Sequence, residues 1–143
     1  MTQATHRVAV DASPELVWEL LVDRVEEPER FMEGVESIAI LDRSDNAVLR
    51  EMTVNGTAVR EWIRIDESGW EITFTLVDDP LYEGTTVHRV EVDYPATTAM
   101  LIFSMDWEPL DPQAPDDPAL AERTVRAAAL YTKALAEQRA KKG

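Results

Sequence analysis

Cysteine is absent from this sequence of 143 residues, which excludes disulfides, a thiol nucleophile, a thiolate zinc site and an iron–sulfur cluster. Basic residues are scarce: 14 Lys and Arg face 28 Asp and Glu, giving a formal net charge of −14. Such a charge repels phosphate backbones and anionic lipids, so a nucleic-acid partner is not expected. No apolar run approaches the ~20 residues of a membrane helix, and the start of the chain lacks the apolar core of a secretory signal. We therefore expect a cytoplasmic protein without membrane insertion.

Several short motifs are missing as well. The sequence contains no His-x-x-x-His, no phosphate-binding loop, no Gly-x-Ser-x-Gly and no Gly-x-Gly-x-x-Gly. These absences argue against metal hydrolase, nucleotide-binding and dinucleotide-binding activities, and we expect neither a metal nor a cofactor. What remains is an ordinary globular composition with 45% hydrophobic residues. The length is that of one domain, predicted here to span residues 1–143.

Two helices frame the predicted structure. After a short strand at 6–10, Ser13 can cap a helix whose first position is Pro14, and Val17, Leu21 and Val25 then follow at helical spacing. Asp117 and a following proline repeat this start signal near the C-terminus. The second helix is predicted to turn a stripe of mostly small residues toward a sheet: Leu120, Thr124, Ala127, Ala128, Tyr131 and Leu135.

Between the helices, the hydrophobic pattern changes to a period of two, which is typical of strands. Because the connections are of hairpin length, antiparallel pairing is expected. Together with the first strand, the pattern predicts an α+β fold with a seven-stranded antiparallel sheet. The further strands are expected at 35–41, 48–54, 57–66, 70–77, 86–94 and 98–108.

The hairpin at Asn55-Gly56 allows the register to be predicted. With these residues as the turn, Arg50 faces Glu61. A four-residue turn over 66–69 would then pair Ile65 with Trp70 and Glu61 with Phe74. A slip of one residue would exchange the two faces, so the pattern specifies the buried side strongly. That side is predicted to carry Val48, Arg50, Met52, Val54, Thr57, Val59, Glu61, Ile63, Ile65, Trp70, Ile72, Phe74 and Leu76.

Two segments resemble a known family. Ala12-Ser13-Pro14-Glu15-Leu16-Val17-Trp18 after a short strand resembles the opening of the START-like (SRPBCC) superfamily, which includes the birch pollen allergen and aromatic polyketide cyclases. Residues 28–37, with Leu49-Arg50-Glu51 and Val59-Arg60-Glu61, are similar to the narrower AtaL-like subgroup. The resemblance implies a helix-grip fold, in which the seven-stranded sheet curves around a long C-terminal helix and leaves an apolar, ligand-binding cavity between the sheet and that helix. It implies no particular catalytic residue.

Arg50 and Glu61 are the charged residues on the predicted apolar face, and two interpretations remain open. They can orient a polar group of a ligand in an apolar cavity, or they can form a self-satisfied cross-strand ion pair. His88 shares its side of a strand with Val90 and Val92. If it pairs near Phe74, it joins Arg50 and Glu61, and Glu61 and His88 become candidate acid–base residues. The alternative is a strand histidine with a local hydrogen bond or access to solvent.

Three functions are compatible with these residues. The first is binding of a small hydrophobic molecule, aromatic or polyketide-like. The second is a cofactor-independent cyclase, dehydratase or isomerase, in which Glu61 or His88 moves a proton and Arg50 holds an oxyanion. The third is a protein-interaction module, for which Trp62 on the outer face is the one indication. A monomer or a homodimer is expected. The predicted ligand-binding residues are Arg50, Met52, Val59, Glu61, Ile63, Trp70, Ile72, Phe74, His88, Phe103 and Tyr131.

Overall fold

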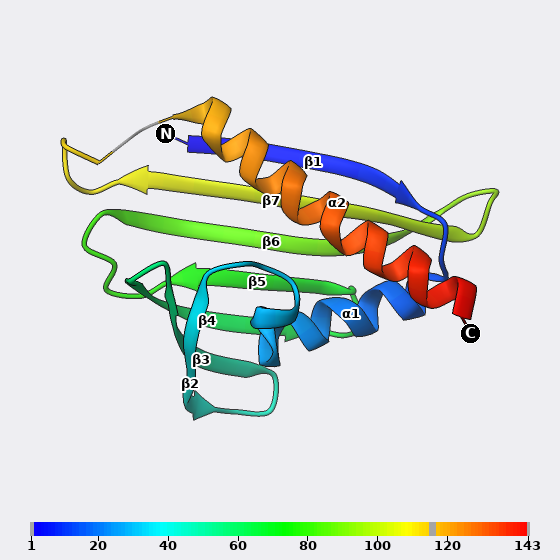
Figure 1. Ribbon diagram of the computed structural model, residues 1–143, viewed down its shortest axis with the longest axis horizontal. Helices are drawn as coiled ribbons and strands as arrows, with labels where there is room; N and C mark the ends of the chain where they lie inside the picture. Colours follow the sequence, from blue (N-terminus) through cyan, green and yellow to red (C-terminus); the bar gives the residue numbers. More distant parts are fainter. Residues whose placement is uncertain (1, 115–116, 143) are drawn as a thin grey trace.

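A computed structural model of the chain describes residues 2–114 and 117–142. Its seven strands form one antiparallel sheet in the order β1-β7-β6-β5-β4-β3-β2, and the long helix α2 lies across it (Figure 1). The predicted α+β helix-grip fold is therefore confirmed. The strands are β1 (Thr2–Val10), β2 (Val35–Arg43), β3 (Ala47–Val54), β4 (Thr57–Asp66), β5 (Glu71–Leu76), β6 (Tyr82–Asp93) and β7 (Thr98–Pro109); the helices are α1 (Pro14–Glu26), the 3₁₀ turn η1 (Pro28–Arg30) and α2 (Pro118–Lys142).

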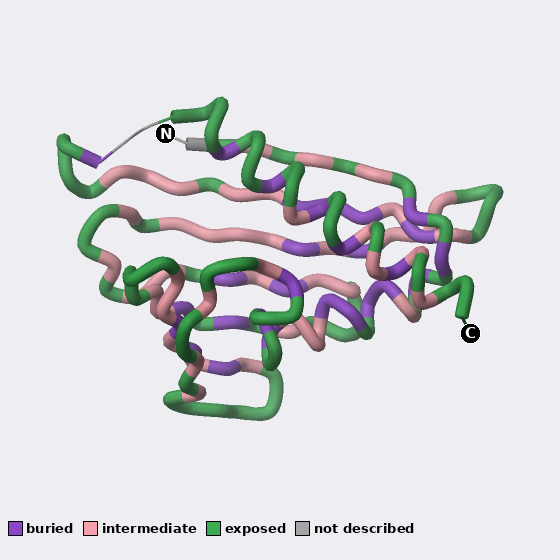
Figure 2. Tube along the Cα trace, viewed as in Figure 1, coloured by how far each residue is buried: buried purple, intermediate pink, exposed green. Residues whose placement is uncertain are grey.

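Helix α1 begins as its sequence predicts. The Ser13 hydroxyl oxygen accepts a hydrogen bond from the Leu16 amide at 3.2 Å, and Pro14 occupies the first helical position. The face of α1 that carries Val17, Leu21 and Val25 is buried in the core, which Figure 2 shows along the inner side of the helix. Just beyond the end of α1, η1 carries the chain toward β2.

Helix α2 contacts the sheet through a different stripe from the one predicted. Its buried residues are Ala121, Val125, Ala129, Thr132 and Ala136. Leu120 and Tyr131, which were expected to face the sheet, are 49% and 48% exposed. The reason is steric: α2 packs mainly on β1 and β7, and small side chains let its backbone approach these strands closely. Ala128 and Leu135 of the predicted stripe are partly buried at its edge.

The β3–β4 hairpin has the predicted register. Asn55 and Gly56 have φ values of 49° and 81°, as a type I′ turn requires, and Arg50 lies opposite Glu61. Trp62, on the opposite face, is exposed as expected. The tight turn therefore fixes which charged residues meet on the inner side of the sheet.

The β4–β5 register is shifted by two residues from the prediction. Glu61 lies opposite Leu76, and Phe74 lies opposite Ile63. The four turn residues are 67–70 because the Asp66 carboxylate accepts hydrogen bonds from Ser68 and Gly69, which keeps Asp66 at the end of the strand. Since a shift of two residues preserves the side of every residue, the predicted inner face is still correct.

The last two strands complete the inner surface. His88 of β6 lies opposite Ile72 of β5 and Phe103 of β7, and Phe74 is the next inward-facing residue of β5, so His88 lies near Phe74 as the condition required. In β7 the side that carries Leu101 and Phe103 faces the core. None of the helices formed by residues 2–114 and 117–142 has the length and apolar character required to cross a membrane.

Candidate ligand-binding cavity

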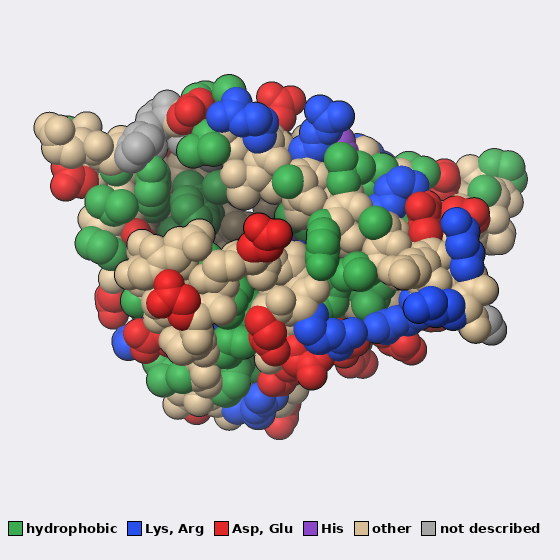
Figure 3. Space-filling view, in the orientation of Figure 1, with side chains coloured by type: hydrophobic (Ala, Val, Ile, Leu, Met, Phe, Trp, Pro, Cys, Tyr) green, Lys and Arg blue, Asp and Glu red, His purple; other side chains and the backbone are tan. Residues whose placement is uncertain are grey.

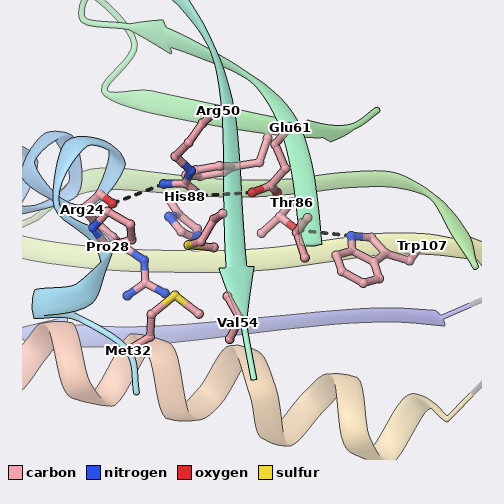
Figure 4. Close-up of a pocket in the computed structure, with 12 residues that line it drawn as sticks. Arg24, Pro28, Met32, Arg50, Val54, Glu61, Thr86, His88 and Trp107 are labelled. Atoms are coloured by element: carbon pink, nitrogen blue, oxygen red, sulfur yellow. Dashed lines mark hydrogen bonds and ion pairs between the residues drawn. The ribbon is translucent and has the colours of Figure 1, made fainter. Parts of the chain in front are cut away.

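A cavity of about 260 Å³ lies on the inner face of the sheet, bounded by β3–β7 and by the segment from α1 through Met32 (Figure 4). No described residue of α2 lines it, so the predicted place between the sheet and the C-terminal helix is corrected: α2 packs closely on β1 and β7, and the space is left beneath α1 instead. The cavity wall is mostly apolar, and its charged or polar side chains come from four different elements. The lining residues are Arg24, Pro28, Met32, Arg50, Met52, Val54, Val59, Glu61, Phe74, Thr86, His88 and Trp107.

Arg50 and Glu61 form a buried ion pair in this wall. Their side chains belong to residues only 4% and 9% exposed, and Arg50 Nη2 donates to Glu61 Oε1 at 3.0 Å. Arg50 Nη1 also donates to the backbone carbonyl of Val25, at 3.0 Å, and more weakly to that of Arg24, at 3.4 Å. These carbonyls belong to the last turn of α1, where the helix dipole favours a cation. Arg50 thus joins the end of α1 to β3 and β4.

The Glu61 carboxyl is affected by two opposing influences. Burial raises its pKa above the usual value, and the nearby guanidinium groups of Arg50 and Arg24 oppose this rise. A carboxyl with a raised pKa is better able to take up a proton near neutrality than an exposed one. The Glu61 carboxyl borders the cavity, and its hydrogen bond with Arg50 holds it in position there.

His88 is stacked on the ring of Phe103 and contacts the tilted ring of Phe74. Its imidazole lies parallel to Phe103, with ring centroids 3.8 Å apart, and 4.7 Å from Phe74. Burial lowers its pKa well below 6.5, and the positive charges of Arg24 and Arg50 lower it further. The ring is consequently neutral at pH 7. Its Nδ1 atom is buried and makes no hydrogen bond to the described residues.

Arg24 is a functional candidate that the sequence reasoning missed. It lies in α1 three residues after Leu21 and seven after Val17, so the spacing of the buried stripe places it on the inner side. Its guanidinium carbon is 5.7 Å from the Phe103 ring centroid and 5.9 Å from that of Phe31. Burial lowers the pKa of Arg24 to about 10, so it still carries its charge at neutral pH. The helical spacing was the signal that could have identified it.

A groove on the surface lies beside the cavity. It has a volume of about 780 Å³, runs between α2 and the segment that joins η1 to β2, and shares Arg24 and Met32 with the cavity wall. Figure 3 shows this face of the molecule hollowed beside α2. Tyr131 lines the groove, and its hydroxyl donates to the Arg30 carbonyl at 3.3 Å. Tyr131, a predicted ligand contact, therefore lines this groove and not the cavity, because it lies on the exposed side of α2.

The predicted ligand-binding residues separate into two groups. Arg50, Met52, Val59, Glu61, Phe74 and His88 line the cavity. Ile63, Trp70, Ile72 and Phe103 do not: the first, third and fourth are fully buried in the core, and Trp70 lies in the β4–β5 turn. Periodicity identifies the inner face but cannot separate core residues from cavity walls. For this reason Val54, Thr86 and Trp107 were not among the predicted ligand contacts, whereas Arg24, Pro28 and Met32 were missed because they lie outside the sheet and reach the cavity only through the docking of α1 and η1.

The predicted acid–base cluster forms only in part. Arg50 and Glu61 meet, whereas His88 borders the same cavity without a hydrogen bond to Glu61. Among residues 2–114 and 117–142, no three His, Asp or Glu side chains are grouped so as to hold a metal ion. The chemistry that this wall offers is therefore two guanidinium groups, one carboxyl and one neutral imidazole around an apolar space.

The curved sheet and the long C-terminal helix form the helix-grip fold, with a mostly apolar cavity on the inner face of the sheet. The sequence matches the family model of AtaL, acetylaranotin biosynthesis cluster protein L, over residues 4–141, and the chain belongs to that family. No curated protein matches the chain.

Solved structures share the fold at low sequence identity. The Zhui aromatase/cyclase from Streptomyces sp. R1128 is 21% identical, with a TM-score of 0.75, 96% of this chain and 94% of that chain being covered. A START superfamily protein from Mycobacterium smegmatis is 17% identical, with 99% of both chains covered and a TM-score of 0.65. The di-domain ARO/CYC StfQ from the steffimycin biosynthetic pathway is 21% identical over 99% of this chain and 46% of its own, with a TM-score of 0.70.

Replacing Arg50 is expected to destabilise the protein strongly. Arg50→Met leaves the Glu61 carboxyl and the α1 carbonyls without their donor, and we expect a loss of about 3–5 kcal/mol in the free energy of unfolding. The matched control is Arg60→Met in the neighbouring pair on the outer face, where Arg60 contacts Glu51 at 3.2 Å in more exposed surroundings. That change should lower stability by less than about 1 kcal/mol. Urea denaturation of both variants measures the difference, and equal losses would contradict it.

The neutral state of His88 predicts a pH dependence of stability. Its pKa is lower in the folded than in the unfolded chain, so the unfolded chain binds more protons as the pH falls below 6.5. Stability should then fall toward acid, with a slope of up to about 1.4 kcal/mol per pH unit from this group. In His88→Gln the slope between pH 6.5 and 5 should be flatter. Urea denaturation across this range measures it; His6→Gln is the control, and an unchanged slope in His88→Gln would refute the assignment.

Proposed function

We propose that this protein binds a small hydrophobic molecule, aromatic or polyketide-like, in the cavity between the sheet and the α1–η1 segment. The observation that carries the proposal is the composition of the cavity wall: apolar and aromatic side chains surround a few convergent polar groups, and some of these have no hydrogen-bond partner among residues 2–114 and 117–142. Small-molecule sites have this composition, because apolar walls supply affinity and a few polar groups orient the ligand.

Family relationships support the same proposal. The chain belongs to a family named after a biosynthesis cluster protein, and two structures with its fold are named as aromatase/cyclases. The volume of about 260 Å³ lies just below the range of roughly 300–1,000 Å³ that is typical of ligand pockets. The ligand is thus expected to be compact, of the order of two fused rings.

A neutral hydrophobic probe tests this function directly. N-phenyl-1-naphthylamine is expected to bind with increased fluorescence and a micromolar dissociation constant, and Val59→Trp should weaken binding about tenfold or more by filling the cavity. Ala58→Trp is the matched control, since adjacent strand residues point to opposite faces and Ala58 is on the outer one. Native mass spectrometry of freshly purified protein should also detect a bound small molecule. Absence of probe binding, or equal binding by both variants, would refute the proposal.

A second candidate function is cofactor-independent catalysis on such a molecule. The specific observation in its favour is that the Glu61 carboxyl and the neutral His88 imidazole, both able to exchange protons, border the same cavity as the cationic Arg50. In a cyclisation or dehydration, Glu61 or His88 would take a proton from carbon beside a carbonyl, and a guanidinium would stabilise the resulting enolate oxygen.

Proton abstraction can be measured without the natural substrate. If Glu61 is a general base, the protein in D₂O should accelerate deuterium exchange into the methyl group of 2-acetonaphthone, followed by NMR. Glu61→Gln should abolish this acceleration while the affinity for the neutral probe changes by less than about threefold. Equal exchange rates in Glu61→Gln and the parent protein would remove Glu61 from catalysis, and no acceleration by the parent would favour binding alone.

A further inference from the structure

The cavity holds two cations in contrasting surroundings. The guanidinium of Arg50 is bonded to Glu61 and to the end of α1. That of Arg24 has no hydrogen-bond partner for Nη1 among the described residues; it lies over the rings of Phe31 and Phe103 and is attracted at longer range by the Glu61 carboxylate. Arg24 Nη1 is buried and unpartnered. Buried charges in proteins are normally paired, so this exception requires an explanation.

The charges in the wall do not cancel. Arg24 and Arg50 contribute two positive charges, Glu61 contributes one negative charge, and His88 is neutral because burial and the two arginines lower its pKa. One positive charge therefore remains within an apolar enclosure. The formal net charge of the whole protein is −14, so this local excess of positive charge is opposite in sign to the charge of the protein.

The unpartnered atoms of the two arginines point to one kind of ligand group. Arg24 Nη1 and Arg50 Nε are buried without an acceptor, and arginine nitrogens only donate. Their natural complement is a group with acceptor oxygens and a negative charge, because such charge-assisted hydrogen bonds are the strongest available. The apolar remainder of the wall excludes a small inorganic anion as the full occupant, since it would leave most of the cavity unfilled.

We infer that the ligand of this cavity is an apolar acid, a compact ring system bearing one carboxylate or comparably acidic oxygen group, and that Arg24 is the residue that selects for its charge. This inference rests on the proposed function and adds the chemical class of the ligand. Arg24 lines both the cavity and the neighbouring groove, whereas Trp107 and Thr86 lie at the other end of the cavity (Figure 4). The acid group accordingly lies at the Arg24 end of the cavity, and the rings extend toward Trp107.

A pair of probes with the same shape and different charge tests the inference. 2-Naphthoate carries a carboxylate where 2-naphthamide carries a neutral amide, and both are titrated calorimetrically into the parent protein, Arg24→Gln and Arg64→Gln. Arg64 lies exposed on the outer face of β4 and is the matched control. The parent and Arg64→Gln should prefer the naphthoate about tenfold or more, and Arg24→Gln should bind both probes within about twofold.

The outcomes separate this inference from the function on which it rests. If the parent binds both probes equally, the ligand is not selected as an anion and the inference fails, while hydrophobic binding stands. If neither they nor N-phenyl-1-naphthylamine bind the parent, the proposed function itself fails. If sodium sulfate raises the melting temperature as much as naphthoate does, the site is a simple anion site and the inference is overturned.

A stability measurement tests whether Arg24 has a purely structural role. In the absence of ligand, an unpaired buried cation opposes folding, so Arg24→Gln should melt at the same temperature as the parent or higher. Naphthoate should then raise the melting temperature of the parent and not that of Arg24→Gln. A marked fall in the melting temperature of Arg24→Gln without ligand would show that Arg24 supports the fold instead, and the inference would be abandoned.

Discussion

The guanidinium of Arg50 connects the elements that form the cavity wall. It contacts the carbonyls of the last turn of α1 and the carboxylate of Glu61, and so links a helix end to two strands within the apolar interior. The segment that follows α1 supplies Pro28 and Met32 to the cavity wall, so the position of that wall depends on this link. A buried ion pair adds little stability compared with apolar packing, but each member depends strongly on the other. The ion pair can therefore support the fold and also take part in ligand binding. The hydrogen bond from Arg50 that stabilises the fold is also the one that holds the Glu61 carboxyl at the cavity wall.

Arg24 gives the cavity a different character from that of a core. Core packing would favour an apolar residue at this position, where helical spacing turns the side chain inward. A charged group without a partner is tolerated when its partner arrives with a ligand, and functional sites often retain such local disadvantages. The packing of His88 against Phe74 and Phe103 contributes to the same electrostatic pattern, since it keeps the imidazole buried and neutral. The polar groups of the wall thus differ in role. Arg50 and Glu61 pair with each other, whereas Nη1 of Arg24 has no hydrogen-bond acceptor among the described residues.

Local rules predicted much of the fold. The Asn55-Gly56 turn determined the β3–β4 register because only a short, left-handed turn joins two strands so tightly, and this placed Arg50 opposite Glu61. The β4–β5 register was wrong by two residues because the hydrogen bonds of the Asp66 carboxylate decide where that turn begins. The stripe on α2 was wrong because its residues are mostly small, and hydrophobicity alone then says little about which side meets the sheet.

The sequence by itself determined the order of elements, the inner face of the strands and the presence of two opposite charges on it, since each follows from periodicity, caps and one turn. Only the tertiary structure decided which inner residues line the cavity and which fill the core. Ile63 and Val59 share a face of β4, yet the first is fully buried in the core and the second borders the cavity. Likewise, α1 had to be docked on the sheet before Arg24 could be seen to meet Phe103. The physical reason is that an enclosed space belongs to no single element: its walls are distant in sequence, and its volume is what their packing leaves unfilled.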